Sequence, residues 1–213
     1  VGFRSTILDP VVTQTQPKSV TATAGYDAIS HAVESFVTSC RTPISDIFAR
    51  DAWQLLNSNF ERVLEKSTDL NARGAMLLGA HEAGIAIAQS MLGATHACAN
   101  PLTVMYGTTH AVAISVMLPH VVRWNGRVVG NRYADLLRAS GRTATTNSAG
   151  DLLATRLEEL ARLGGLPGTL RDINAVKGDF SALAENAATQ WTGTFNPRPF
   201  DAKAALDLYE RAY

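Results

Sequence analysis

The sequence contains few cysteines, and their arrangement excludes a disulfide framework. Only Cys40 and Cys98 occur among 213 residues. Neither belongs to a CxxC pair, so thiolate zinc binding is not indicated. A chain of this length buries a sizeable core without covalent cross-links. Sparse cysteine use is typical of a reducing compartment, and we therefore expect a cytoplasmic protein.

An excess of charge of either sign is also absent. Lys and Arg together number 19, and so do Asp and Glu. This balance indicates no basic platform for nucleic acid or for anionic lipid, and we expect no nucleic-acid partner. The hydrophobic content of 46% and the charged content of 18% indicate a soluble globular protein that is slightly poor in charge.

No charged side chain occurs from Ala83 to Val122, and a membrane span is the first alternative for this stretch. Polar residues and a proline interrupt it, among them Gln89, Asn100 and Pro101. No clean run of about 20 apolar residues remains, which a spanning helix requires. We therefore interpret the stretch as one helix or a helix pair at the centre of a soluble bundle, and we expect no membrane partner.

The sequence shows no glycine-rich phosphate-binding loop after a strand, so no nucleotide site is visible in it. Only the first dozen residues, rich in Val and Thr, are typical of a strand. The first residues include neither the apolar core of a signal peptide nor a starting Met. We therefore expect residues 1–16 to be a strand remnant or an extended entry segment, and the chain to be part of something longer.

What the sequence does contain is a series of helices. Capping residues and apolar side chains at helical spacing predict them over residues 18–38, 43–64, 72–92, 95–106, 109–124, 133–139, 151–163, 179–190 and 201–213, with a polar loop at 143–150. The predicted fold class is all-α, a multi-helix bundle that occupies residues 17–213 and follows a short extended N-terminal segment.

Asp27 and His31 are the first pair of candidate metal ligands. On a helix, residues four apart share one face, with Cβ atoms about 5–6 Å apart, so both reach one ion. Their apolar neighbours, including Ile29 and Val33, predict that this face is buried. A buried Asp without a partner is costly. The alternative is a simple Asp–His hydrogen bond inside a core, and for this pair alone that alternative is favoured.

His96 and His110 form the second pair, and they need a break in the helix between them. Fourteen residues of continuous helix span about 21 Å, which is too far for two imidazoles to share an ion. The segment from Gly107 to Thr109 is the obvious place for a reversal, and Pro101 bends the first piece. Two unrelated core histidines are the alternative here, and alone that alternative is again favoured.

Taken together, the two pairs favour a metal site over a simple Asp–His hydrogen bond and two unrelated core histidines. One carboxylate and three imidazoles suit Fe²⁺ or Zn²⁺ better than Mg²⁺ or Ca²⁺, which prefer oxygen ligands. Four protein ligands either close a structural site or leave a further position open for a substrate oxygen, as catalysis requires. The spacing leaves both possibilities open.

Three segments of the sequence resemble the iron-containing (group III) alcohol dehydrogenases. Residues 25–34 are similar to the family pattern G-x-D-A-hydrophobic-x-H-A-x-E. Residues 93–121 are similar to the family's histidine-containing region, and residues 196–198 are similar to its NPR motif near the C-terminus. The matches are spread from residue 9 to about residue 200.

The resemblance implies the C-terminal helical domain, of dehydroquinate synthase-like fold, of a two-domain enzyme. The other domain, of α/β type with a GGGS-type turn, would bind NAD or NADP. The extended entry segment, residues 1–16, would then be a remnant of this missing nucleotide-binding domain or a linker from it. The resemblance assigns Asp27, His31, His96 and His110 as ligands of Fe²⁺, with Zn²⁺ as an alternative. It implies hydride transfer between a small alcohol or aldehyde and the nicotinamide, and a homodimer for the full-length protein. We expect the chain alone to be catalytically inactive.

Asn100 is a departure from the family pattern. Many members have a second His four residues after the third ligand, near the nicotinamide, and this chain has Asn100 there. An amide exchanges hydrogen bonds but does not shuttle protons near neutral pH. Proton release would then use water or a ribose hydroxyl, or the activity differs. A metal-free oxoacid reductase of the same superfamily and a non-catalytic metal-binding bundle remain as alternatives.

Overall fold

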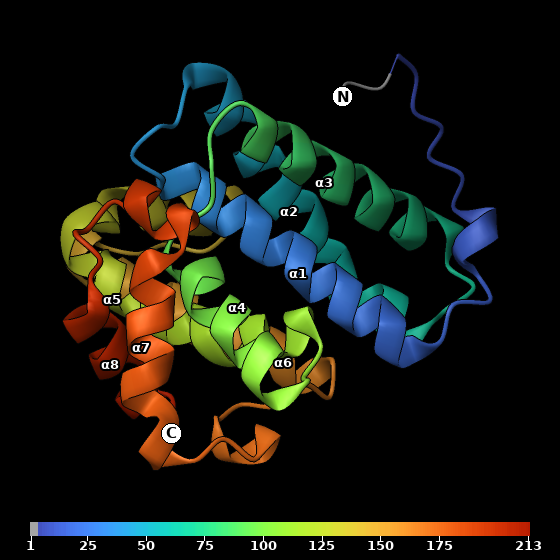
Figure 1. Cartoon of the computed structure of the whole chain (residues 1–213). Coiled ribbons are helices and arrows are strands. Elements are labelled where there is room, and N and C mark those ends of the chain that lie inside the picture. The colour runs from blue at the N-terminus through green and yellow to red at the C-terminus, as the bar shows by residue number, and fades with distance from the viewer. Residues whose placement is uncertain (1–3) are drawn as a thin grey trace.

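The computed structural model describes residues 4–213, and within that range it contains helices and no strand (Figure 1). This confirms the all-α fold class. The α-helices are α1 (Lys18–Val37), α2 (Pro43–Glu65), α3 (Leu70–Ala88), α4 (Ala94–Tyr106), α5 (His110–Ala139), α6 (Thr146–Leu163), α7 (Phe180–Thr189) and α8 (Ala202–Arg211). Short 3₁₀ helices lie at Val11–Thr13, Arg171–Ile173, Lys177–Asp179 and Trp191–Phe195.

Helix α1 joins two groups of helices. On one side it packs against α2 and α3, which also pack against each other, and on the other it packs against α5. Helix α5 in turn packs along α6, while α4 contacts both α5 and α7, and α7 pairs with α8 (Figure 1). Helix α1 is therefore buried along most of its length and carries Tyr26, Ile29 and Val33 with no exposed area.

Several predicted helix ends agree with the structure because local capping determines them. Thr42 caps α2 and exchanges hydrogen bonds with Ser45 in a capping box. Asp69 caps α3 by accepting a hydrogen bond from the Ala72 amide. The end of α3 differs, since the helix stops at Ala88 and not near residue 92.

The predicted polar loop at 143–150 is wrong. Helix α6 begins at Thr146, and Thr145 forms a capping box with Ser148. Ser, Thr and Asn resemble a loop in composition, but here they supply the acceptors that start the helix. The two predicted helices at 109–124 and 133–139 form one element, α5, with a non-helical backbone at Val129.

Of the two interpretations of the N-terminal residues, a strand remnant or an extended entry segment, the strand is wrong for the residues that the structure describes. Residues 4–10 have no regular structure, and Val11–Thr13 form a 3₁₀ helix that follows Pro10. A strand needs a neighbouring strand for its hydrogen bonds, and residues 4–213 provide none. The first three residues of that prediction lie outside the described range.

Much of the charge-poor stretch lies in the interior, as predicted, but Val104 and Met105 at the end of α4 are exposed. Ala94, Cys98, Ile114 and Val116 have no exposed area, and the Cys98 side chain therefore serves as a small apolar filler. Across residues 4–213, no helix is both long enough and apolar enough to cross a bilayer.

Candidate metal centre

Three helices bring the candidate ligands together. Asp27 and His31 lie on successive turns of α1, His96 lies in the first turn of α4, and His110 is the first residue of α5. Small side chains on α4 and α5, such as Ala97, Ala99 and Ala113, are fully buried, and they permit close approach of the backbones. Side chains up to 83 positions apart in the sequence thus lie next to one another.

A tight reversal between α4 and α5 places His96 near His110. Helix α4 ends at Tyr106, and Gly107 follows with φ of 64° in the left-handed region. Glycine adopts this conformation without the steric cost that a Cβ brings. The break occurs where the sequence predicted it, and the ring centroids of His96 and His110 lie 5.2 Å apart.

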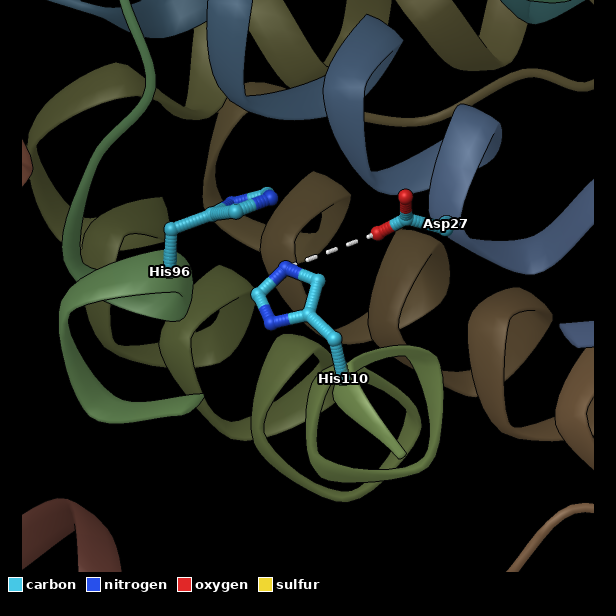
Figure 2. A group of neighbouring side chains, drawn as sticks. All are labelled: Asp27, His96 and His110. Atoms are coloured by element: carbon cyan, nitrogen blue, oxygen red, sulfur yellow. Dashed lines mark ion pairs between the residues drawn. The ribbon is translucent and has the colours of Figure 1, made fainter. Parts of the chain in front are cut away.

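The side chains of Asp27, His96 and His110 converge on a common point (Figure 2). Each offers one ligand atom, and these atoms all lie within 4.8 Å of one another. His110 Nε2 lies 3.8 Å from Asp27 Oδ1. Three ligand atoms that each bind an ion at about 2.0–2.2 Å are separated from one another by about 3–4 Å, so the spacing is close to that of a metal site.

His31 lies beside this group but not within it. Its Nε2 is 3.5 Å from Asp27 Oδ2, and its ring stacks on the His96 ring with centroids 5.1 Å apart. Asp27 and His31 are only partly buried, whereas the sequence predicted a buried face. The structure therefore brings three of the four predicted ligands into one cluster and places His31 next to Asp27 and His96.

Two polar atoms at the centre of the cluster have no hydrogen-bond partner. Asp27 Oδ1 and His96 Nε2 are both buried from solvent and unpaired. A buried acceptor without a partner is costly, and both atoms are of the kinds that bind Fe²⁺ or Zn²⁺. The donor set and the two unpaired atoms fit a divalent ion between α1, α4 and α5.

Glu34 orients His96 from behind, and the sequence reasoning did not identify this role. Its Oε2 lies 2.6 Å from His96 Nδ1. The same carboxylate accepts hydrogen bonds from the backbone N–H groups of Gly93 and Thr95. The bond to Nδ1 leaves Nε2 free to face the cluster. Its position on α1, one turn after His31, was the available signal, since it shares the face of Asp27 and His31.

The lowered pKa values of His31 and His110 favour their neutral forms. Burial lowers the pKa of His31 to about 4, against the opposing effect of Asp27. Burial, and then the neighbouring His96, lower the pKa of His110. Burial by itself would raise the pKa of Glu34, but its hydrogen bond with His96 leads the interactions that lower it. Neutral imidazole and ionised carboxylate are the protonation states that bind a metal ion.

Asn100 lies one turn after His96 on α4. Its side-chain amide donates a hydrogen bond to Gln190 Oε1 at the end of α7, with an N–O distance of 3.1 Å. In this arrangement its amide holds α7 to α4. The predicted position of Asn100 near a nicotinamide stays a prediction.

The NPR segment contacts the start of α4, which is the end of the helix that carries His96. Asn196 Oδ1 accepts hydrogen bonds from the Ala94 amide and the Asn125 side chain. Arg198 donates to the Trp124 carbonyl, and its guanidinium lies over the Trp124 ring. Asn196 is 7% exposed. The sequence motif was recognised, but its role as a clamp on the start of α4 emerges only from the structure.

The fold and the cluster define an all-helical domain with a carboxylate–imidazole group whose donors fit a divalent ion. Comparison with known proteins agrees: residues 21–213 match the family model described as "Fe-containing alcohol dehydrogenase family, C-terminal". The chain belongs to the iron-containing alcohol dehydrogenase family.

The chain is similar to enzymes that are much longer. It is 31% identical over 210 residues to 1,3-propanediol dehydrogenase from Citrobacter freundii, covering 97% of this chain and 54% of that protein. It is 30% identical over 200 residues to lactaldehyde reductase from Escherichia coli K12, covering 92% and 52%. The solved structure of an alcohol dehydrogenase from Oenococcus oeni superimposes with a TM-score of 0.92 at 30% identity, covering 96% and 54%. The chain thus spans about half the length of these relatives.

Proposed function

We propose that this chain is the metal-binding helical domain of an NAD(P)-dependent alcohol dehydrogenase that acts on a small alcohol or aldehyde. The observation that carries the proposal is the convergence of Asp27, His96 and His110 from three helices, with ligand atoms within 4.8 Å of one another. Membership of the family and the names of the relatives support the reaction class.

In this proposal Asp27, His31, His96 and His110 hold the ion, which is Fe²⁺ with Zn²⁺ as the alternative. His31 completes the ligand set after a small change of its side-chain torsions, since its Nε2 is already 3.5 Å from Asp27 Oδ2. When bound, the ion supplies Lewis-acid chemistry, which lowers the pKa of an alcohol and polarises a carbonyl.

The residues of this chain contribute orientation and the exclusion of water. Glu34 fixes the His96 ring so that Nε2 faces the centre. The apolar side chains of α4 and α5 exclude water from the hydride-transfer path. Asn100 would approach the nicotinamide and would offer hydrogen bonds but no titratable proton, so proton release would pass through water or a ribose hydroxyl. The NAD or NADP would be held mainly by residues that are not in this chain.

Metal binding is tested with the purified chain, prepared without chelator and loaded anaerobically with Fe²⁺ or Zn²⁺. We expect about one ion per chain by elemental analysis. His96→Ala should abolish binding while the helical circular dichroism persists, and His81→Ala, on α3, serves as the matched control. Stoichiometric metal in the His96→Ala protein would contradict the assignment, and only trace metal in the wild type would favour a metal-free reductase.

Catalysis is tested with the full-length product of the gene that encodes this chain. We expect it to oxidise NADH or NADPH in the presence of small aldehydes, and His96→Ala to abolish that activity. The isolated chain should show no turnover. A full-length protein that binds the ion but turns over no alcohol or aldehyde would instead support a non-catalytic metal-binding bundle.

A further inference from the structure

Arg73 is a buried cation without an acidic partner. It lies in the first turns of α3 and is 3% exposed. Its Nε donates to the Ser67 carbonyl, and its Nη1 lies 3.4 Å from the Thr13 hydroxyl. Both of these partners are neutral. The ion pairs found in residues 4–213 join carboxylates to other arginines or to histidines, and Arg73 takes part in none of them.

This arrangement is unfavourable unless an anion approaches. A buried charge that lacks a counter-charge loses hydration without gaining an equivalent interaction. Carbonyl and hydroxyl oxygens compensate only part of that loss. The guanidinium is planar, with five N–H donors, and this geometry matches a carboxylate in a two-point hydrogen bond. The guanidinium of Arg73 can therefore accommodate one negatively charged group.

Two cavities adjoin Arg73 and provide the space for it. One has a volume of about 250 Å³ and lies between α1, α3 and the entry segment. The other has a volume of about 230 Å³ and lies toward the end of α2. Both cavities are lined by Gln16, Thr21, Val63 and Arg73. The guanidinium therefore stands between two spaces that a small ligand can enter.

Thr21 supplies a second and independent sign of a ligand. It is 8% exposed, it lines both cavities, and its Oγ1 has no hydrogen-bond partner. A hydroxyl in a helix commonly bonds to a carbonyl one turn earlier, as Thr23 does to Ser19. The Thr21 hydroxyl makes no such bond, so its O–H has no acceptor among residues 4–213.

Apart from Arg73, the charged groups around the two cavities either cancel each other or attract an anion. Lys18 and Glu65 both line the cavity toward α2 and carry opposite charges, which leaves Arg73 as the net charge. Helix α1 begins there without a side-chain cap, because its N-cap is Pro17. The uncapped N–H groups and the helix dipole add to the attraction for an anion.

The first cavity is otherwise lined by carbon. Its walls include Ala24, Met76, Leu77 and Ala80, together with Val63. Such walls favour an aliphatic chain over a second polar group, since burial of apolar surface is favourable. An anion with several charges, such as phosphate, would find only one buried cation and no further charged donor on this side.

We propose that this site binds a short aliphatic carboxylate. The carboxylate accepts hydrogen bonds from Arg73 and Thr21, and the hydrocarbon tail lies along Ala24, Met76 and Ala80. The site is formed by α1, α2, α3 and the entry segment, and it does not depend on the metal centre or on the proposed reaction.

The first experiment titrates the purified chain with butyrate and hexanoate at constant ionic strength and follows the melting temperature and the heat of binding. We expect saturable binding, tighter for hexanoate, with a rise in melting temperature. Butan-1-ol tests the hydrocarbon tail without the carboxylate, and sodium chloride tests the effect of a simple anion. Neither should show saturable binding. Inorganic phosphate should also fail. Absence of saturable binding of both carboxylates to the wild type overturns the proposal.

The second experiment assigns the donors. Thr21→Val should raise the melting temperature of the ligand-free chain, because it removes an unpaired buried hydroxyl. It should also weaken butyrate binding about tenfold, since a hydrogen bond to a charged group is lost. Thr23→Val, on the same helix, should leave the affinity unchanged. Wild-type affinity in Thr21→Val would overturn the assignment of this residue even if the stability rises.

Arg73→Gln completes the test. We expect it to abolish carboxylate binding while the variant still binds metal as the wild type does. If Arg73→Gln does not fold, Thr21→Val decides the question alone. Unchanged butyrate affinity in a folded Arg73→Gln protein contradicts the proposal.

Discussion

Glu34 on α1 holds His96 on α4 through a 2.6 Å contact between Oε2 and Nδ1. Both side chains are nearly inaccessible to solvent. The carboxylate also accepts hydrogen bonds from the Thr95 and Gly93 N–H groups, at 2.7 and 3.2 Å. A single side chain therefore organises the start of α4 and orients the imidazole that faces Asp27 and His110.

Glu34→Gln is expected to weaken metal binding without removing a ligand. The neutral amide stabilises the His96 Nδ1–H group less than the carboxylate does. Its NH₂ group is a hydrogen-bond donor and cannot accept a bond from a backbone N–H group. Loss of such an outer partner typically lowers metal affinity about 10–100-fold. Competition with a chromogenic chelator measures the change. The exposed Glu61→Gln is the control, and equal affinities for Glu34→Gln and wild type would argue against the orienting role.

Asn196→Ala should destabilise the chain and loosen the metal site together. The substitution removes the acceptor for the Ala94 N–H and both bonds to Asn125. Leaving buried groups unsatisfied costs about 1–3 kcal/mol each, so we expect a loss of about 2–4 kcal/mol in urea unfolding. Metal affinity should fall as well, because α4 carries His96. Asn131→Ala, at an exposed position of α5, should change neither quantity. An unaffected metal affinity would show that the clamp does not reach the centre.

Glu82→Gln should change how stability depends on pH. Burial, and then the negative charge of Asp51, raise the pKa of Glu82 to about 7 from its usual 4.5. Between these values the folded chain keeps a proton that the unfolded chain has lost. This contribution to the free energy of unfolding therefore falls as pH rises from 4.5 to 7. Solvent screening limits the effect to about 1 kcal/mol.

The measurement compares wild type and Glu82→Gln by urea unfolding at pH 5 and pH 8. The difference between the two proteins is the informative quantity, because the lowered pKa of His31 acts in the opposite direction. That histidine binds a proton more readily in the unfolded chain, so its contribution to stability rises as pH rises from about 4 to 6.5. The variant should gain stability relative to wild type at pH 8. The exposed Glu185→Gln should follow the wild type, and parallel profiles for all three proteins would contradict the assignment.

Gly126→Ala should destabilise the contact between α5 and α6. A Cβ at Gly126 would lie 2.8 Å from the Cα of Gly150, and backbone atoms cannot move aside as a side chain does. Overpacking of this kind costs about 1–3 kcal/mol. Gly84→Ala on α3 is the matched control, since a Cβ there meets no atom within 4 Å, and it should raise stability by up to about 1 kcal/mol. Similar effects of the two substitutions would show that α5 and α6 are not in close contact there.

The helix boundaries could be predicted where the signal is local. Thr42 and Asp69 accept hydrogen bonds from amides three residues ahead, and Gly107 allows the left-handed turn after α4. The same principle explains the error at residues 143–150. Thr145 and Ser148 act as caps there, but their composition is also that of a loop. The strand considered as one alternative for the N-terminal residues is not formed, because strand formation depends on a distant partner.

The candidate site could be predicted in part. The spacing of Asp27 and His31 on one helix, and the need for a break between His96 and His110, follow from helix geometry alone. The sequence could not show that His31 stands slightly apart from the other three. It also could not show that the amide of Asn196 reaches the start of α4 across 102 positions. Such contacts depend on how the helices pack.

The sequence by itself determined that the chain is helical, that its charge-poor middle is interior, and which side chains have the chemistry of metal ligands. These properties depend on residue type and on neighbours within one or two turns. Only the tertiary structure decided that three ligand atoms meet, that Glu34 supports one of them, and that Arg73 is buried without a counter-charge. Each of these depends on long-range packing, in which small differences in helix position decide whether two polar atoms touch.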